Sequence, residues 1–392
     1  MADFSALIMV ISYLTRGALN GDLAIHRTPL DKPILIFLCV LGLSMIHVVD
    51  LPFGIRNYFR HVQLFIIFYI LSSGLQKSDI KRTLTLFLVF TSLHSTFNIF
   101  QSLFSSGHIR SFGIAGVFFN DILVVSLLIA YSFYLFHKDV KKKRFYGLVF
   151  FVALGGLVVS QTRGAVLSFL LGYFFVTVVA LKKARDLKLA YVKRNFLRST
   201  GLILTILLVF MIFSPSILLG FSHRFYTITQ GPAETIELRF VLWGTAVKSF
   251  LQNPILGVGL GQFARISQVL PELRFNPLFA YVSGLGAHNI VLSYLTETGI
   301  LGLLCLFYLM LKSLRLGWIN FKRSKSEAEV PISVSLLGVL FFVVASSFYA
   351  GEWFWSVSGM LFMFLLALLV VFNKSMGNEN ELWRRQSNPN YR

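Results

Sequence analysis

Arg163, Arg239 and His288 are residue types that together suit one kind of chemistry. A guanidinium group presents a planar fork of N–H donors, so two arginines can hold a diphosphate and stabilise its negative charge. An imidazole can accept a proton from a hydroxyl group within hydrogen-bond reach. Side chains of these types on one face of a protein suit a substrate that carries a diphosphate and a hydroxyl to be activated.

Each of the three residues also has a plainer interpretation. Arg163 adjoins an apolar segment, and its side chain could extend to the lipid headgroups. Arg239 on a surface helix could contact lipid phosphates, and His288 at the end of a helix could be a structural histidine. The combination is more informative than any single member, and it depends on the elements that carry the residues.

The composition shows which elements these are. The 392 residues are 56% hydrophobic, 15% aromatic and only 14% charged, whereas a soluble domain has about 25% charged residues. Apolar runs close to the ~20 residues that cross a bilayer recur along the chain. They predict an all-α polytopic membrane protein with about 11–12 transmembrane helices and one large periplasmic loop containing amphipathic helices. The predicted spans are 3–19, 33–50, 59–75, 82–104, 111–136, 145–159, 164–181, 200–220, 288–312, 333–349 and 353–372.

The net charge of +19 does not indicate a nucleic-acid partner, because the basic residues form short clusters between apolar runs. Such clusters occur at 137–144, 182–198 and 312–325, and they are typical of the cytoplasmic loops of membrane proteins. We therefore expect membrane lipids, and no nucleic acid, among the partners.

The orientation of the site follows from the segment 145–181. As a single helix this segment would be ~55 Å long, far more than a bilayer needs. Both of its flanks are rich in lysine, so the chain must cross outward and return, turning at 160–164. This places Arg163 at the outer face. Counting the membrane crossings that follow places Arg239, His288 and Glu352 on the outer side as well.

The same count divides the chain into four predicted parts. They are the N-terminal transmembrane helices over 1–220, a large periplasmic loop over 221–287, the C-terminal transmembrane helices over 288–372 and a cytoplasmic tail over 373–392.

Within the large loop, the segment 237–250 reads as a helix that carries Arg239 and lies on the membrane surface. The glycine-rich stretch 257–261 follows it. Its backbone N–H groups could cradle a phosphate, but a plain tight turn is the favoured interpretation.

No metal site or cofactor is expected. The chain has no Asp-x-Asp pair and few carboxylates on the outer side, which argues against a Mg²⁺ or Mn²⁺ site. The two cysteines, Cys39 and Cys305, lie in apolar runs and are interpreted as packing residues.

Three groups of residues resemble the O-antigen ligase and O-antigen polymerase superfamily of bacterial envelope glycosyltransferases, and together they cover residues 145 to 315. The first is the turn SQTRGA at 160–165. The second is LRFVLW at 238–243 with NPILGVGLGQF at 253–263. The third is GAHNI at 286–290 with ETGILG at 297–302, and it looks most like the ligase.

The resemblance implies a specific reaction. The ligase transfers O-antigen polysaccharide from undecaprenyl diphosphate to lipid A–core at the periplasmic face of the inner membrane, with inversion and without metal or nucleotide. It implies that Arg163 and Arg239 bind the diphosphate and that His288 is the base. Asn289 and Glu352 are added as candidate acceptor or donor contacts. A polymerase that extends another lipid-linked chain remains an alternative, as does a polysaccharide transporter or flippase.

Overall fold

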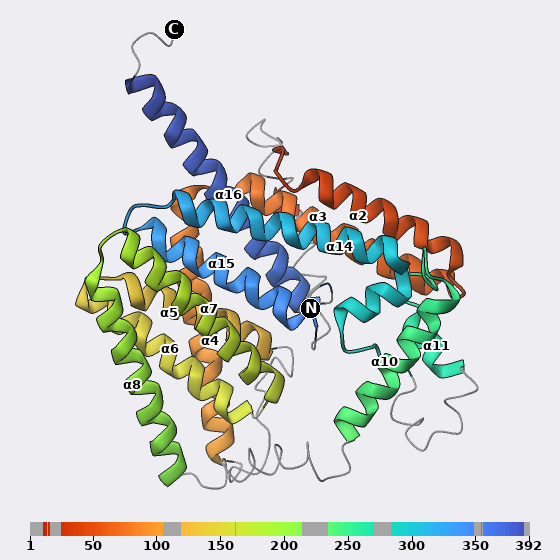
Figure 1. Ribbon diagram of the computed structural model, residues 1–392, viewed down its shortest axis with the longest axis horizontal. Coiled ribbons are helices and arrows are strands. Elements are labelled where there is room, and N and C mark those ends of the chain that lie inside the picture. Colours follow the sequence, from red (N-terminus) through yellow and green to blue (C-terminus); the bar gives the residue numbers. More distant parts are fainter. Residues whose placement is uncertain are drawn as a thin grey trace. The chain divides into compact units, whose positions relative to one another are not determined.

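The structure is a computed structural model, and every regular element in its described part is helical (Figure 1). The residues that it describes are 11–13, 15, 25–104, 119–160, 162–213, 234–269, 284–348, 354 and 356–387. The predicted all-α class is therefore confirmed. The chain divides into two compact units, which are described separately below.

The prediction of a multi-pass membrane protein is also confirmed. Among the described residues, seven helical segments are long and apolar enough to cross a bilayer. Each corresponds to one of the predicted spans. They are Lys77–Ser102, Phe119–Phe136, Val140–Ser160, Arg163–Asp186, Ile290–Arg323, Glu329–Ser346 and Val357–Met376.

Near the N-terminus the helix boundaries differ from those predicted. The helix expected over 33–50 is α2 (Asp31–Ser44), whose 14 residues span only about 21 Å. The next helix, α3 (Leu51–Gly74), begins earlier than the predicted residue 59 because Asp50 caps it. The Phe53 N–H donates to Asp50 Oδ1 at 3.1 Å, which satisfies one of the exposed donors of the first turn. Apart from residues 11–13 and 15, the predicted span 3–19 lies outside the described residues.

The first unit consists of residues 1–74, 227–315 and 344–370. Its described elements include α2, α3 and two helices of the predicted large loop, α10 (Glu234–Gln252) and α11 (Phe263–Val269). The predicted helix over 237–250 is thus confirmed as part of α10. This unit also contains most of α14 (Ile290–Arg323) and the beginning of α16 (Ser356–Ser387).

The second unit consists of residues 75–226, 316–343 and 371–392. Its helices include α4 (Lys77–Phe104), α5 (Phe119–Phe136), α6 (Val140–Ser160), α7 (Arg163–Asp186) and α8 (Ala190–Phe213). Helix α5 packs against the other four and is buried on nearly every side, as expected of a helix that is apolar all round. α15 (Glu329–Ser346) lies mostly in this unit as well.

The turn between α6 and α7 is the one predicted at 160–164. α6 ends at Ser160, α7 begins at Arg163, and only two residues separate them. Asn120 at the start of α5 holds this turn, because its Nδ2 donates to Thr162 Oγ1 at 3.0 Å. The structure therefore has the short turn between two apolar helices that an out-and-back path requires.

Candidate functional site

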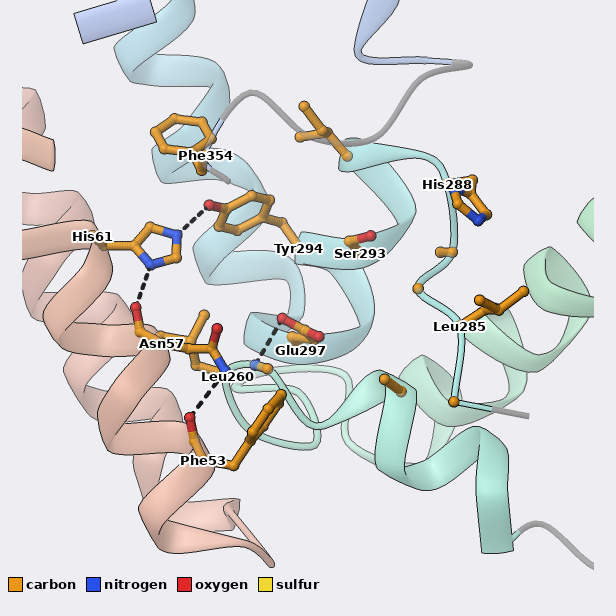
Figure 2. Close-up of a pocket in the computed structure, with 16 residues that line it drawn as sticks. Phe53, Asn57, His61, Leu260, Leu285, His288, Ser293, Tyr294, Glu297 and Phe354 are labelled. Carbon is orange, nitrogen blue, oxygen red and sulfur yellow. Dashed lines mark hydrogen bonds between the residues drawn. The ribbon is translucent and has the colours of Figure 1, made fainter. Parts of the chain in front are cut away.

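His288 stands at the entrance to α14 in an unusual backbone conformation. Its φ of 48° lies in the left-handed region, which histidine adopts more readily than most non-glycine residues. Strained backbone of this kind is frequent at functional sites. The side chain is half-buried, and His288 is one of the residues that line the cavity shown in Figure 2.

The surroundings of His288 favour its neutral ring. Burial lowers the pKa of the His288 imidazole, and the positive charge of Arg239 lowers it further. A ring that is neutral at pH 7 can accept a proton from a hydroxyl group. The chemistry expected of His288 from its residue type is therefore available at this position.

Arg239 lies close enough for its charge to act on His288, because α10 is attached to the loop before α14. One turn along α10 from Arg239, Trp243 donates its indole N–H to the carbonyl oxygen of Ala287 at 3.0 Å. Leu242 and Ala246 of the same helix pack with Phe263 and Ala287 in a small buried cluster. The structure thus brings Arg239, itself half-buried, and His288 together in the first unit.

Arg163 belongs to the second unit, where it is the first residue of α7 and is half-buried. The N-terminus of a helix carries a partial positive charge, to which the guanidinium adds a full one. Anions are favoured at such an end. Its local setting therefore suits the predicted role of Arg163 in binding a phosphate group.

Asn289 has both of its polar groups engaged within the protein. Its Oδ1 accepts the N–H of Leu292 at 3.1 Å, which makes it the cap of α14, and its Nδ2 donates to the Phe348 carbonyl at 2.8 Å. It is buried and does not line the cavity beside His288. These contacts give Asn289 a role in fixing the backbone next to His288. Glu352 lies outside the described residues.

The glycine-rich stretch 257–261 is a tight turn whose donors are used internally. The Val258 and Gly259 N–H groups donate to the carbonyl oxygens of Thr296 and Glu297 at 2.9 and 3.0 Å. The Gly261 N–H donates to the Glu297 carboxylate at 2.8 Å. With these donors occupied, the hydrogen bonds support the turn interpretation over a phosphate cradle.

This turn fits into a break in α14. At Gly299, with φ 65° and ψ −166°, the helical path is interrupted. The Ile300 N–H, which has lost its helical acceptor, donates instead to the Pro254 carbonyl at 2.9 Å. A Cβ atom on Gly299 would lie 2.3 Å from the Ile255 carbonyl oxygen, and one on Gly257 only 2.4 Å from the Glu297 carbonyl carbon. Glycine is required at both positions.

A cavity of about 330 Å³ lies beside His288 (Figure 2). One wall is the face of α14 that carries Ile290, Ser293, Tyr294 and Glu297, which are spaced three and four residues apart. The other described residues that line it are Phe53, Asn57, His61, Leu260, Gly261, Ala264, Gly284, Leu285, Gly286, Ala287, His288 and Phe354.

Two polar residues of this cavity, His61 and Tyr294, were not identified from the sequence. The helical spacing from Ile290 to Glu297 is a signal that could have revealed Tyr294. His61 carries no comparable signal, since it lies in α3 and is separated from Tyr294 by 233 positions.

A multi-pass helical membrane protein with a histidine that lines a cavity, and an arginine whose charge acts on that histidine, has the parts of a membrane-bound transferase. Residues 148–307 match the sequence family described as O-Antigen ligase. This segment of the chain is therefore similar to the O-Antigen ligase family, and the resemblance noted in the sequence is confirmed over these residues. The matched segment runs from α6 into α14 and includes Arg163, Arg239 and His288. No curated protein matches the chain.

In general terms, the family match supports glycosyl transfer of the ligase or polymerase type on lipid-linked glycans. It comprises less than half of the chain, so the helices before α6 and after α14 are assigned from the structure alone.

Proposed function

We propose that this protein is an O-antigen ligase of the bacterial inner membrane. It would transfer O-antigen polysaccharide from undecaprenyl diphosphate to a hydroxyl group of lipid A–core at the periplasmic face. The observation that carries the proposal is the position of His288, which lines a cavity near Arg239 inside the segment that matches the O-Antigen ligase family.

In the proposed reaction His288 accepts the proton of the acceptor hydroxyl as its oxygen attacks the anomeric carbon of the donor sugar. The bond from that carbon to the diphosphate oxygen breaks, and undecaprenyl diphosphate leaves with the bonding electrons. A single displacement of this kind inverts the anomeric centre. The His288 imidazolium then loses its proton to water, which the nearby charge of Arg239 favours.

The leaving diphosphate needs positive charge rather than a proton, because it is already a good leaving group. Arg239 would supply this charge next to His288 through its planar donor fork. Arg163 is proposed as the second diphosphate ligand because the family match includes it and because it lies at the positive end of α7. The mechanism calls for no metal or nucleotide.

The proposed periplasmic orientation is supported by the short α6–α7 turn and the lysine-rich flanks of these two helices. In this orientation the residues before α14, with His288, lie on the outer side. That is the side to which undecaprenyl-linked polysaccharide and lipid A–core are delivered in the reaction that we propose.

A transporter would be expected to use a broken helix to coordinate its cargo. The break in α14 at Gly299 has a different use, because Pro254 accepts the Ile300 N–H and Val258 donates to the Thr296 carbonyl. The backbone groups released by the break are therefore bound by the glycine turn, and this favours an enzyme over a flippase.

Electrophoresis of lipopolysaccharide from a deletion strain tests the proposal against the O-antigen polymerase alternative. Loss of a ligase should leave bare lipid A–core while lipid-linked polymer accumulates. Core carrying a single repeat would instead identify a polymerase. Complementation with the wild-type gene, but not with His288→Ala, should restore the long chains if the proposal is right.

A further inference from the structure

We infer that the cavity beside His288 holds the sugar of the acceptor, and that Tyr294, oriented by His61, is the contact that selects it. This inference rests on the proposed function. The acceptor hydroxyl must lie within hydrogen-bond reach of the base, and His288 is one of the residues that line the cavity (Figure 2).

The charges of the residues that line the cavity indicate which of the two substrates it holds. Among the described residues that line the cavity there is no lysine or arginine, and Arg239 is not one of them. A diphosphate would therefore be poorly stabilised inside it, whereas an uncharged sugar would not need a cation. The donor diphosphate is accordingly assigned to the Arg239 side of His288, and the acceptor to the cavity.

The size and lining of the cavity fit a sugar. Its volume of about 330 Å³ is at the lower end of the ~300–1,000 Å³ typical of small-molecule sites, so it suits a short glycan end rather than a polymer. Its wall includes aromatic rings from Phe53, Tyr294 and Phe354 and polar groups from Asn57 and Ser293. Such a surface matches a sugar ring, which has apolar faces and hydroxyl groups at its edge.

The hydrogen bonds of His61 determine how the Tyr294 hydroxyl is oriented (Figure 2). His61 Nδ1 lies 2.7 Å from the carbonyl oxygen of Asn57, which can only accept, so Nδ1 carries a proton. Nε2 is then the acceptor of the neutral ring, and the Tyr294 O–H donates to it at 2.7 Å. The lone pairs of the Tyr294 oxygen can therefore accept a hydrogen bond from a hydroxyl group of the ligand.

The His61–Tyr294 pair is held rigidly. Phe354 stacks on the His61 ring with 5.8 Å between centroids and an angle of 19°. Both members of the pair are buried among aromatic side chains. Rigid placement of this kind lets a single hydrogen-bond acceptor discriminate between sugars that differ in one hydroxyl group.

Two other polar side chains of the cavity, Glu297 and Asn57, already make hydrogen bonds within the wall. The Glu297 carboxylate accepts the Gly261 and Phe263 N–H groups at 2.8 and 3.3 Å. Asn57 Nδ2 donates to the Phe53 carbonyl at 2.9 Å. Tyr294, whose donor is fixed by His61 while its oxygen can still accept, is the residue to which we assign recognition of the acceptor.

The test is a comparison of purified full-length Tyr294→Phe with wild type, using lipid-linked O-antigen as donor and lipid A–core as acceptor. Removing the hydroxyl should raise the KM for lipid A–core on the order of 10-fold and leave the donor KM and the pH profile unchanged. His61→Gln should shift the acceptor KM in the same direction, since Tyr294 loses its orienting partner.

Tyr131→Phe is the matched control, because it removes another buried hydroxyl, one that lies 2.9 Å from Thr177 Oγ1 in the second unit. It should leave both KM values unchanged. A wild-type acceptor KM in an active Tyr294→Phe enzyme would overturn the inference and leave the proposed function standing. Equal increases in both KM values with a lowered Tm would show a merely structural role, which also overturns it.

Binding of the lipid-free core oligosaccharide, titrated without donor, separates this inference from the proposed function. Wild type should bind it, and Tyr294→Phe should bind it about 10-fold more weakly. If wild type does not transfer O-antigen to lipid A–core at all, the proposed function fails. The inference itself fails if wild type does not bind the oligosaccharide.

Discussion

The indole N–H of Trp243 donates a 3.0 Å hydrogen bond to the carbonyl oxygen of Ala287, the residue directly before His288. This bond joins α10, which carries Arg239, to the strained backbone that presents the imidazole. The charge of Arg239 acts on His288 as a consequence. This hydrogen bond, together with the buried contacts of Leu242 and Ala246, couples the segments that carry Arg239 and His288.

Trp243→Phe should weaken this coupling. The substitution keeps an aromatic ring but leaves the Ala287 carbonyl without its donor, a loss of about 1–3 kcal/mol for a buried group. We expect kcat for ligation to fall by roughly 10-fold while the protein still folds. Trp318→Phe, an equivalent change in the second unit, is the control. Equal rates in the two variants would contradict the role given to Trp243.

His288→Ala should abolish transfer and leave donor binding intact, since Arg239 would still hold the diphosphate. His288→Gln keeps a hydrogen-bonding side chain but cannot accept a proton, so it should be nearly as inactive. A ligation assay with lipid-linked donor and lipid A–core measures both variants. Substantial activity in His288→Gln would show that the residue only positions the acceptor, and the base would have to be sought elsewhere.

The activity of wild type should fall on the acidic side of neutrality. Burial and then the charge of Arg239 lower the pKa of His288 below its ordinary value of 6.5. The ring is therefore neutral at pH 7, and it becomes protonated and inactive as the pH falls through this lowered pKa. Arg239→Gln removes the charge that lowers the pKa of His288, so the acidic limb of its residual activity should shift to a higher pH. If the acidic limb does not shift, the charge of Arg239 does not act on the base, and this prediction is wrong.

Arg163→Ala and Arg239→Ala should each reduce ligation on the order of 10²-fold or more, as expected when one preorganised charge donor is lost. Lysine should rescue either position poorly, because it offers a point charge in place of a two-pronged donor. Arg185→Ala, an exposed arginine in the last turn of the helix that Arg163 begins, is the control. Wild-type ligation by Arg239→Lys would refute bidentate diphosphate binding at that position.

Labelling of single cysteines tests the proposed orientation. After replacement of Cys39 and Cys305, cysteines placed at Thr162 and Gln230 should react with a membrane-impermeant thiol reagent in intact spheroplasts. One placed at Lys142, in the basic turn that we assign to the cytoplasm, should react only after lysis. The reverse pattern would put Arg163 on the cytoplasmic side and exclude a periplasmic site.

Much of the fold could be predicted from the sequence because the bilayer imposes a simple length and polarity requirement on each helix. The turn at Ser160–Arg163 followed from the combined length of two helices and their lysine-rich flanks. α2 was predicted too long because the chain leaves the α-helix at Ser44, continues as a short 3₁₀ helix over Met45–His47 and is extended at Val48, although the segment stays apolar.

The sequence by itself determined the class of protein and seven of the predicted spans, and it proposed the residue types of the site, since hydropathy, charge and the motifs around Arg239 and His288 are local properties of the chain. Only the tertiary structure decided that the glycine turn fills the break at Gly299 and that His61 meets Tyr294 in a cavity. These contacts join segments that are far apart along the chain. Such contacts form because buried polar groups need hydrogen-bond partners. The partners here come from distant segments, so a local sequence pattern does not predict them.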